Sequence, residues 1–288
     1  MICPLCTYTE WSPSWAGSIS YRGKEYEYRR CLSCGSLYSY PMPDAETLAL
    51  MYGTDYERFL SAEESMSGVM GAGEVIRWLG LNRPGTFIDY GCGAGHLLRE
   101  AAKRGWRSVG VELDQRIAEK YGNGAEVLIV TDPAKLSGER KADVLHLGDV
   151  IEHLTDPDAQ IPHILSLLKK GGILLAQGPL EANPNLFLTV MRWARLLRGR
   201  RILEMPPYHV IQATAGGQRA FFTRFGLVEL AFTIHEVSWP APGRLAMGDL
   251  LNPRAVALFS VRCVSQFVSG FRPSVLGNRY FYAGRWNG

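Results

Sequence analysis

The chain lacks a strong excess of charge of either sign, an internal repeat and a low-complexity segment. Its 31 basic and 28 acidic side chains leave a net charge of +3. That charge is too small and too dispersed for the concentrated basic surface on which nucleic-acid binding depends. Composition therefore does not favour nucleic acid as a partner. Because 47% of the 288 residues are hydrophobic, the chain can bury a sizeable core and is not expected to be disordered.

The sequence also lacks a recognisable leader and a long apolar run. It begins Met1-Ile2-Cys3-Pro4, without the basic start and apolar stretch of a secretory signal. The most apolar late segment, 255–271, is interrupted by Arg262 and Gln266 and is too short to cross a bilayer core of about 30 Å. We therefore expect a cytoplasmic protein.

Cysteine is scarce, but four of the six cysteines form two Cys-x-x-Cys pairs, Cys3/Cys6 and Cys31/Cys34. Each pair offers two sulfurs from one tight loop, so the four thiolates can converge on one zinc ion. Two disulfides or a redox-active pair are the alternatives, and a reducing cytoplasm disfavours the disulfides. A four-cysteine zinc site is closed, which predicts a structural role for the ion.

The pattern of the chain changes twice. Residues 1–40 predict a small zinc ribbon with a short hairpin over 21–29, and 41–74 predict a helical connector with a helix over 45–51 capped by Asp44. From residue 75, helices alternate with short apolar runs, which predicts a parallel α/β sheet covered on both faces. The expected strands are 87–90, 108–112, 126–130, 143–147, 173–177, 227–233 and 279–282, and the expected helices lie near 95–104, 114–121, 157–169, 184–198 and 214–225.

A glycine-rich segment, Asp89-Tyr90-Gly91-Cys92-Gly93-Ala94-Gly95, lies between the first of these strands and a helix. Dinucleotide folds use Gly-x-Gly-x-x-Gly, whereas His96 occupies the last glycine position here. The turn therefore suits a ligand that has no pyrophosphate and carries an amine near Asp89. Glu112 ends the next strand, where a carboxylate can accept both ribose hydroxyls of a nucleoside.

These residues resemble the class I S-adenosylmethionine (SAM)-dependent methyltransferases. The resemblance includes Gly110-Val111-Glu112-Leu113-Asp114, an Asp-x-x-Glu-His-x-x-x-Pro segment over 149–157, and Leu168-Lys169-Lys170-Gly171-Gly172, in which Lys170 replaces the usual proline. Cys31-Leu32-Ser33-Cys34-Gly35, Pro41-Met42-Pro43 and Tyr52/Tyr56 resemble the subgroup with a zinc ribbon before the methyltransferase domain. Several members of that subgroup modify nucleotide-linked sugars, saccharide chains or other biosynthetic intermediates.

The resemblance implies a Rossmann-like seven-stranded methyltransferase sheet of order 3-2-1-4-5-7-6, with an antiparallel last strand. The methyltransferase domain is then 75–288 with an insertion at about 236–278. It also implies that the methionine end of SAM lies over the glycine turn, the ribose on Glu112 and the adenine near 131–132. The implied cofactor-binding residues are Asp89, Gly91, Gly93, Gly95, Glu112, Asp132 and Asp149.

Methyl transfer from a sulfonium needs an aligned nucleophile and, for most acceptors, removal of a proton. His153 follows the fourth strand and is the first candidate base, and Glu152 can orient it, bind a metal or cap a helix. His209, in the proline-stiffened segment 206–210, is the second candidate. Packing roles remain the alternative for both histidines.

The acceptor is indicated only weakly. Arginines at helical spacing, among them Arg192, Arg195 and Arg198, form either a solvated face or a docking surface for a phosphate-bearing substrate. Trp193 and the apolar run 186–188 allow a peripheral membrane contact, and core packing explains them equally well.

The sequence therefore predicts a methyltransferase acting on a small or carrier-linked intermediate, with a saccharide or a nucleotide- or lipid-linked sugar favoured. An inactive methyltransferase-like scaffold or RNA-binding protein is the alternative, and a nicotinamide oxidoreductase is disfavoured by His96 and the Glu152-His153 segment. The oligomeric state is not predicted.

Overall fold

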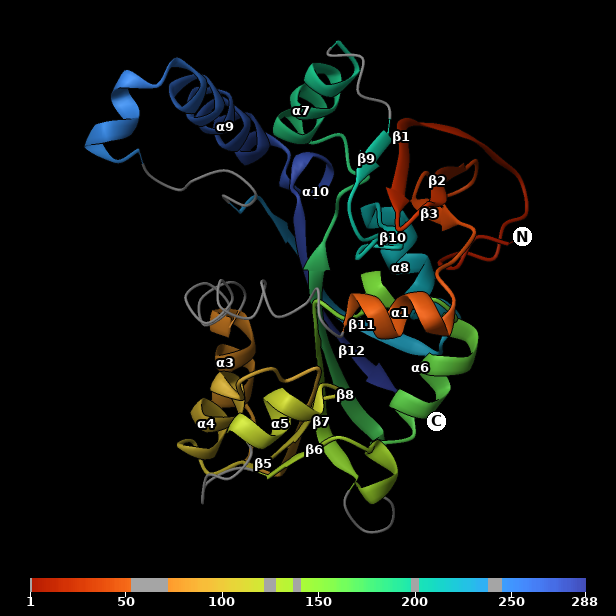
Figure 1. Cartoon of the computed structure of the whole chain (residues 1–288). Coiled ribbons are helices and arrows are strands. Elements are labelled where there is room, and N and C mark those ends of the chain that lie inside the picture. Colours follow the sequence, from red (N-terminus) through yellow and green to blue (C-terminus); the bar gives the residue numbers. More distant parts are fainter. Residues whose placement is uncertain (1, 53–71, 122–127, 137–140, 198–201, 238–244) are drawn as a thin grey trace.

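The computed structural model describes residues 2–52, 72–121, 128–136, 141–197, 202–237 and 245–288. Its larger sheet has seven strands in the order β11-β12-β8-β7-β4-β5-β6 (Figure 1). These strands are β4 (Thr86–Tyr90), β5 (Arg107–Val111), β6 (Leu128–Val130), β7 (Ala142–Gly148), β8 (Leu168–Pro179), β11 (Leu227–His235) and β12 (Arg279–Trp286). The strand order and the antiparallel pairing of β12 with β8 confirm the predicted methyltransferase sheet. The first residues of the predicted strand 126–130 lie outside the described residues.

Helices cover both faces of this sheet, as the alternating pattern predicts. One face carries α3 (Ala72–Leu81), α4 (His96–Ala102) and α5 (Gln115–Tyr121), and the other carries α6 (Pro157–Leu165) and α8 (Ala215–Arg224) (Figure 1). Successive strand residues point to opposite faces, so Phe87 packs in the core beneath α3 and α4 while Ile88 packs in the core beneath α6 and α8. Helix α6 ends earlier than the predicted 169 because Leu168 already pairs with Ala142 as the start of β8.

A second, five-stranded sheet has the order β10-β3-β2-β1-β9. Its strands are β1 (Trp11–Tyr21), β2 (Lys24–Cys31), β3 (Leu37–Tyr40), β9 (Ile202–Glu204) and β10 (Ile211–Gln212). A hairpin is present, but its predicted bounds are wrong, because residues 24–29 lie in β2 alone and the first strand is β1. Its turn is at Arg22 and Gly23, whose φ angles of 50° and 78° suit a tight hairpin turn. Strand β9 pairs parallel with β1 and β10 antiparallel with β3, so a distant part of the chain completes the N-terminal sheet.

The two sheets share one hydrophobic core. Cys3, Leu5, Cys31 and Tyr38 belong to the same buried cluster as Leu145 of β7. The predicted helix α1 (Ala45–Met51) is confirmed, and the Asp44 side chain accepts a hydrogen bond from the Thr47 amide at 2.9 Å. Residues 53–71 of the predicted connector, including Tyr56, lie outside the described residues, and residues 72–74 begin α3.

The remaining helices lie together at one end of the molecule (Figure 1). They are α7 (Leu186–Leu197), the 3-10 turn η3 (Met247–Leu251), α9 (Pro253–Phe271) and α10 (Pro273–Leu276). Two further 3-10 turns, η1 (Pro133–Leu136) and η2 (Ile151–His153), follow β6 and β7. Within the described ranges, no helix combines the length and apolarity that a membrane crossing requires.

Candidate functional site

The glycine turn joins β4 to α4 and adopts a backbone that favours glycine. Gly91, Gly93 and Gly95 have φ angles of 77°, 50° and 72°. The Gly91 amide donates to the Val111 carbonyl at 2.8 Å, which fixes the turn against the end of β5. A Cβ on Gly93 would meet nothing within 4 Å, so there is open space at the centre of the turn. The turn therefore presents free backbone surface to a ligand.

Glu112 lies directly beside this turn. Its Oε2 accepts a hydrogen bond from the Gly93 amide at 2.9 Å, and its Oε1 accepts one from the Asp114 amide at 3.0 Å. Burial raises the pKa of the Glu112 carboxyl, and the two amide hydrogen bonds oppose that rise. The structure thus brings Glu112, the predicted ribose ligand, against the glycine turn that the resemblance assigns to the methionine end of SAM.

Asp89 has a partner that the sequence did not predict. It lies in β4 with 4% of its surface exposed, and His146 Nδ1 of the neighbouring strand β7 is 2.7 Å from its Oδ1. Because the carboxylate accepts, the imidazole donates through Nδ1. Asp132, by contrast, is exposed and follows β6 by two residues.

Three predicted catalytic side chains, Glu152, His153 and His209, meet near the carboxyl end of β7, and their ligand atoms lie within 4.8 Å of one another. The rings of His153 and His209 cross at 79° with centroids 5.0 Å apart. His153 Nδ1 is 2.7 Å from the Tyr208 carbonyl, and His209 Nδ1 is 2.9 Å from Glu181 Oε2. Since both of these oxygens accept, each imidazole is held with its Nδ1 as the donor.

Burial and mutual charge shift the pKa of all three groups. Burial, helped by the charge of His209, lowers the pKa of His153 to about 4. Burial and the charge of Asp149 raise the pKa of Glu152 to about 8. Burial alone would lower the pKa of His209, but the Glu181 carboxylate outweighs it and raises the pKa to about 9. The cluster is thus an electrostatically coupled unit at neutral pH.

Asp149 precedes this cluster in a left-handed backbone conformation with φ of 53°. Arg279, the first residue of β12, donates to its two carboxylate oxygens at 2.8 and 2.5 Å. The Asp149 side chain is 47% exposed, and against the opposing effect of partial desolvation the Arg279 guanidinium lowers the pKa of its carboxyl. The ion pair therefore keeps Asp149 ionised at the edge of the cluster.

Sequence reasoning missed Glu181, Arg279 and the partner role of His146. Each lies in or next to a predicted strand, where a charged or titratable side chain reaches the neighbouring strand or the edge of the sheet. A charged or titratable side chain at such a position was the signal that could have pointed to these residues. Pairing across strands could not be assigned from the sequence alone.

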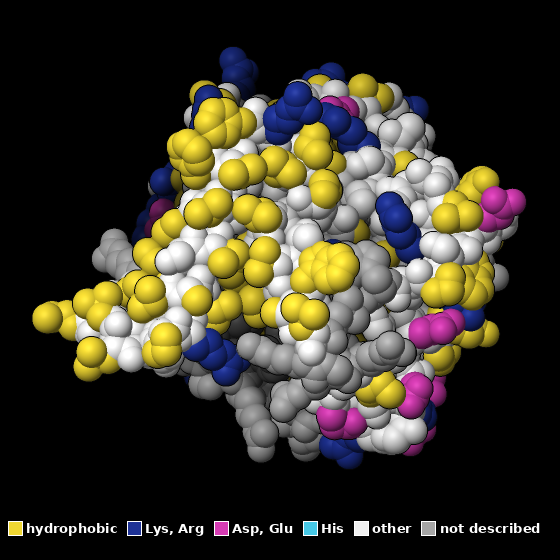
Figure 2. All heavy atoms as spheres, turned by 90° about the horizontal axis from the view of Figure 1, so that it is seen from above, with side chains coloured by type: hydrophobic (Ala, Val, Ile, Leu, Met, Phe, Trp, Pro, Cys, Tyr) yellow, Lys and Arg dark blue, Asp and Glu magenta, His cyan; other side chains and the backbone are white. Residues whose placement is uncertain are grey.

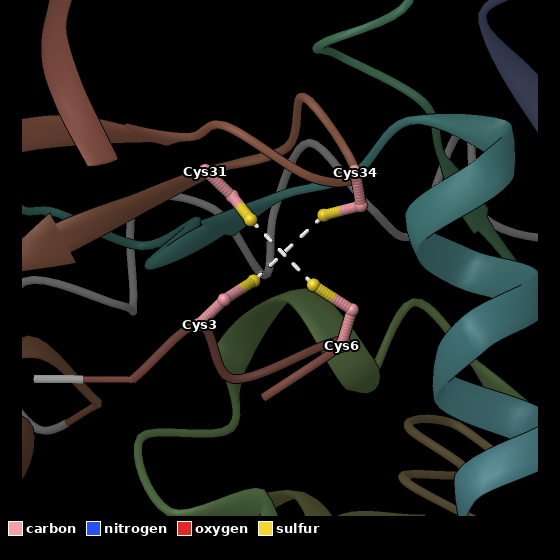
Figure 3. A group of neighbouring side chains, drawn as sticks. All are labelled: Cys3, Cys6, Cys31 and Cys34. Atoms are coloured by element: carbon pink, nitrogen blue, oxygen red, sulfur yellow. Dashed lines mark hydrogen bonds between the residues drawn. The ribbon is translucent and has the colours of Figure 1, made fainter. Parts of the chain in front are cut away.

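The four predicted zinc ligands converge (Figure 3). Cys3 Sγ is 3.8 Å from Cys34 Sγ, and Cys6 Sγ is 3.5 Å from Cys31 Sγ. Zinc–sulfur bonds of about 2.3 Å in a tetrahedron would place the sulfurs about 3.8 Å apart. The spacing therefore fits one tetrahedral ion.

Two cavities lie where the acceptor is expected to bind. One of about 470 Å³ is lined by polar side chains, among them Glu74, Gln177, Thr233 and His235. It borders the site because the Gln177 carbonyl accepts a hydrogen bond from the Asp149 amide at 3.0 Å. A smaller cavity of about 190 Å³ is lined by Arg30 and Arg192. Arg198 and the side chain of Arg195 lie outside the described residues.

Comparison with known proteins fits this geometry. Residues 70–230, more than half of the chain, match the family model described as "Methyltransferase domain". The chain belongs to this methyltransferase family. The matched segment includes the glycine turn and most strands of the larger sheet.

Curated relatives match over part of the methyltransferase chain. A ubiquinone biosynthesis O-methyltransferase of Ruegeria pomeroyi is 31% identical over 139 residues, covering 42% of this chain and 56% of the relative. A ribosomal protein L11 methyltransferase of Thiobacillus denitrificans is 35% identical over 121 residues, covering 41% and 40%. The chain spans about half the length of the curated relatives it matches.

Solved structures share the fold at low sequence identity. A magnesium protoporphyrin IX methyltransferase from Synechocystis PCC 6803 with bound S-adenosylhomocysteine has a TM-score of 0.53 and 17% identity, over 84% of this chain and 100% of the other. A SAM-dependent methyltransferase from Archaeoglobus fulgidus has a TM-score of 0.50 and 16% identity, over 79% and 99%. These likenesses show the α/β methyltransferase fold.

Proposed function

We propose that the chain transfers a methyl group from SAM to a biosynthetic intermediate. The observation that carries this proposal is the open glycine turn with the Glu112 carboxylate beside it. The backbone of Gly91, Gly93 and Gly95 holds the methionine end of SAM, and Glu112 accepts the ribose hydroxyls. Asp89 and Asp149 complete the methionine side, and Asp132 lies toward the adenine.

The acceptor is activated at Glu152, His153 and His209. Glu152 and His153 lie in η2, directly after β7, the strand beside β4, and His209 reaches them from the segment before β10. The cluster therefore lies at the carboxyl edge of the sheet, where ligands bind in open α/β sheets. The acceptor atom passes its proton through this cluster to solvent and bonds to the methyl carbon. The electron pair of the broken carbon–sulfur bond stays on sulfur and leaves neutral S-adenosylhomocysteine.

A saccharide or a nucleotide- or lipid-linked sugar is the favoured acceptor. Four side chains that line the larger cavity can donate or accept hydrogen bonds, namely Glu74, Gln177, Thr233 and His235. They suit a ligand with several hydroxyl groups, and Ile234 and Phe281 offer apolar surface beside them. The arginine pair of the smaller cavity suits a phosphate of a carrier-linked sugar. Most of the matching relatives are named ubiquinone biosynthesis O-methyltransferases, so a quinone precursor is the competing acceptor class.

The four cysteines hold a structural zinc ion. Their sulfur spacing fits a tetrahedron, and a site with four protein ligands leaves no open position for chemistry. Thiolate ligation and free cysteines are typical of a reducing compartment, which supports the cytoplasm as the location.

Isothermal titration with SAM, S-adenosylhomocysteine and NADH tests the cofactor. We expect micromolar binding of the two methionine nucleosides and none of NADH. Glu112→Ala should weaken SAM binding by about 10-fold or more, because hydrogen bonds to a charged group contribute about 1.5–3 kcal/mol each. Glu119→Ala, a matched change at an exposed position of α5, should leave binding unchanged.

Failure of a folded, metal-loaded sample to bind SAM would contradict the proposed cofactor. If SAM binds, methyl transfer to nucleotide sugars and to phenolic quinone precursors separates the acceptor classes. Turnover with the phenols and not with the sugars would contradict the saccharide proposal.

A further inference from the structure

The carboxyl group of Glu152 is buried and incompletely hydrogen-bonded. Its side chain is 5% exposed, and among the described residues its Oε1 has no hydrogen-bond partner. Native proteins rarely leave a carboxylate oxygen in this state, because its desolvation is costly unless a donor or a cation faces it. The two imidazoles of His153 and His209 lie beside it. We propose that Glu152, His153 and His209 bind a divalent cation.

The surroundings of the two histidines suit metal ligation. The Tyr208 carbonyl and the Glu181 carboxylate each hold an Nδ1 hydrogen. An imidazole held this way offers the lone pair of Nε2 to a metal ion once any proton on that nitrogen is displaced, and such second-sphere acceptors are what orient metal-binding histidines. His153 comes from η2 and His209 from the segment before β10, so two distant segments converge on one point.

The local charge also suits a dication. Glu152 and Glu181 together supply two negative charges when ionised, while Asp149 and Arg279 neutralise each other. Two imidazoles and one carboxylate leave further coordination positions open. An acceptor hydroxyl in one of them would release its proton to solvent more easily and become the nucleophile for the methyl carbon. This role, unlike the binding itself, rests on the proposed function.

Manganese titration followed by electron paramagnetic resonance tests the site, because bound Mn²⁺ loses the six-line signal of the hydrated ion. Mn²⁺ prefers oxygen and nitrogen ligands, so the cysteine site does not compete. We expect one equivalent to bind the full chain. Glu152→Ala and His209→Ala should each weaken binding by about 10-fold or more. His163→Gln, at an exposed position of α6, should bind as the parent does.

The same samples are titrated with SAM. SAM binding retained in Glu152→Ala, with Mn²⁺ binding lost, supports the cation site and keeps the two proposals separate. No stoichiometric Mn²⁺ binding by a protein that binds SAM overturns the cation site alone. Mn²⁺ binding that survives both substitutions also overturns it.

A different observation concerns helix α9, which exposes apolar side chains and buries polar ones, the reverse of a normal surface helix. Val264, Phe267 and Phe271 recur at helical spacing and are 53%, 70% and 73% exposed. The buried face instead carries Arg262, Ser265 and Ser269. A helix in water buries its apolar stripe and exposes its polar one, so the exposed face of α9 suits an apolar environment.

Hydrogen bonds fix this orientation. Ser265 Oγ accepts from the Phe187 amide of α7 at 3.1 Å, and Ser269 Oγ donates to Glu236 and to the Ser265 carbonyl. Rotating α9 to bury its phenylalanines would break these contacts and expose Arg262. The orientation is therefore specified by the fold.

Neighbouring elements extend the apolar surface. Trp193 and Leu197 of α7 are 59% and 84% exposed, and Met247 and Leu251 of η3 are 89% and 91% exposed. Hydrophobic side chains spread over the left of the view in Figure 2, where α9 lies in Figure 1, and most acidic side chains lie on the right. We call the exposed parts of α7, η3 and α9 the apical face.

The charged residues of the apical face indicate the chemistry of its partner. Exposed Arg254 and Arg272 lie at the two ends of α9, and Asp249 is the one acidic residue in the described parts of α7, η3, α9 and α10. A two-fold contact between copies would place these arginines against arginines. Apolar side chains flanked by arginines instead match the interface of an anionic bilayer. We infer that the apical face docks on an anionic lipid surface.

Co-sedimentation of the full chain with vesicles tests this inference. We expect binding to phosphatidylcholine vesicles containing phosphatidylglycerol, weaker binding to pure phosphatidylcholine, and loss of binding at high salt. Leu251→Glu and Phe267→Glu should each reduce the bound fraction by about 10-fold or more, because the charge would enter the apolar layer. Leu81→Glu, which is 75% exposed at the end of α3, is the matched control.

Absence of binding to the anionic vesicles overturns the inference. Equal loss in Leu81→Glu overturns it as well, because the effect would then not belong to the apical face. A dimer in light scattering that Phe267→Glu dissociates assigns the surface to a second copy and also overturns it. SAM binding is independent of all three outcomes.

Discussion

At the scale of single residues, Gly217 shows how closely α8 approaches the cysteine cluster. It lies in the first turn of α8 against the cysteine cluster, and a Cβ there would come within 2.2 Å of Ser36 Oγ and 3.2 Å of Cys34 Sγ. Its neighbour Gly216 faces open space, with nothing within 4 Å. The sequence shows two adjacent glycines, and the tertiary contact makes glycine necessary at position 217 only.

Gly217→Ala should therefore lower the free energy of unfolding by about 1–3 kcal/mol through overpacking. Gly216→Ala should leave it unchanged or raise it by up to about 1 kcal/mol, because alanine favours the helix. Urea unfolding of the two variants measures the difference. Equal effects of the two substitutions would contradict the close contact.

The catalytic cluster also belongs to the residue scale. The sequence predicted Glu152, His153 and His209 as separate candidates, and the structure brings all three together. It did not predict Glu181 or Arg279, because each acts through a partner more than 25 residues away in the chain. The periodicity of a strand or helix carries no information about such a partner.

At the scale of elements, Thr214 links α8 to the cysteine cluster. Its Oγ1 accepts from the Gly217 amide at 3.0 Å as the helix N-cap and donates to the Cys34 carbonyl at 2.7 Å. Thr214→Ala should lower the free energy of unfolding by about 1–2 kcal/mol in urea. Thr223→Ala, in the exposed last turn of the same helix, should change it by less than about 0.5 kcal/mol. A cost in Thr223→Ala as large as that in Thr214→Ala would contradict the capping role.

The helices and strands also show which elements sequence periodicity can predict and which it cannot. The helix over 214–225 and the strand over 227–233 follow from periodicity and are confirmed within one or two residues. The two short strands β9 and β10 were not predicted, because a strand of two or three residues has no period to detect. They form by pairing with β1 and β3, which lie far earlier in the chain: Ile202 pairs with Ser18, and Ile211 pairs with Tyr38.

At the scale of the whole molecule, the shared core predicts one cooperative unfolding transition. Cys6→Ser should remove one equivalent of zinc and lower the unfolding temperature of the entire chain by about 5 °C or more, because a structural metal contributes directly to folding. Cys263→Ser, at an exposed position of α9, should keep the zinc and the unfolding temperature. Calorimetry with metal analysis measures both. Two separate transitions would contradict a single core.

The sequence by itself determined the local chemistry of this protein. The glycine turn, the two cysteine pairs and the alternation of apolar strands with helices lie within short segments, and short-range spacing is sufficient to specify a turn, a knuckle or a strand. These patterns gave the seven-stranded sheet, its order through the family resemblance, and the convergence of the cysteines.

The tertiary structure alone decided which surfaces and charges face each other. The completion of the N-terminal sheet by β9 and β10, the Asp149–Arg279 and Asp89–His146 pairs, and the inverted orientation of α9 all join segments far apart in the chain. Their energies come from burial and from specific hydrogen bonds across those contacts, which local sequence does not encode.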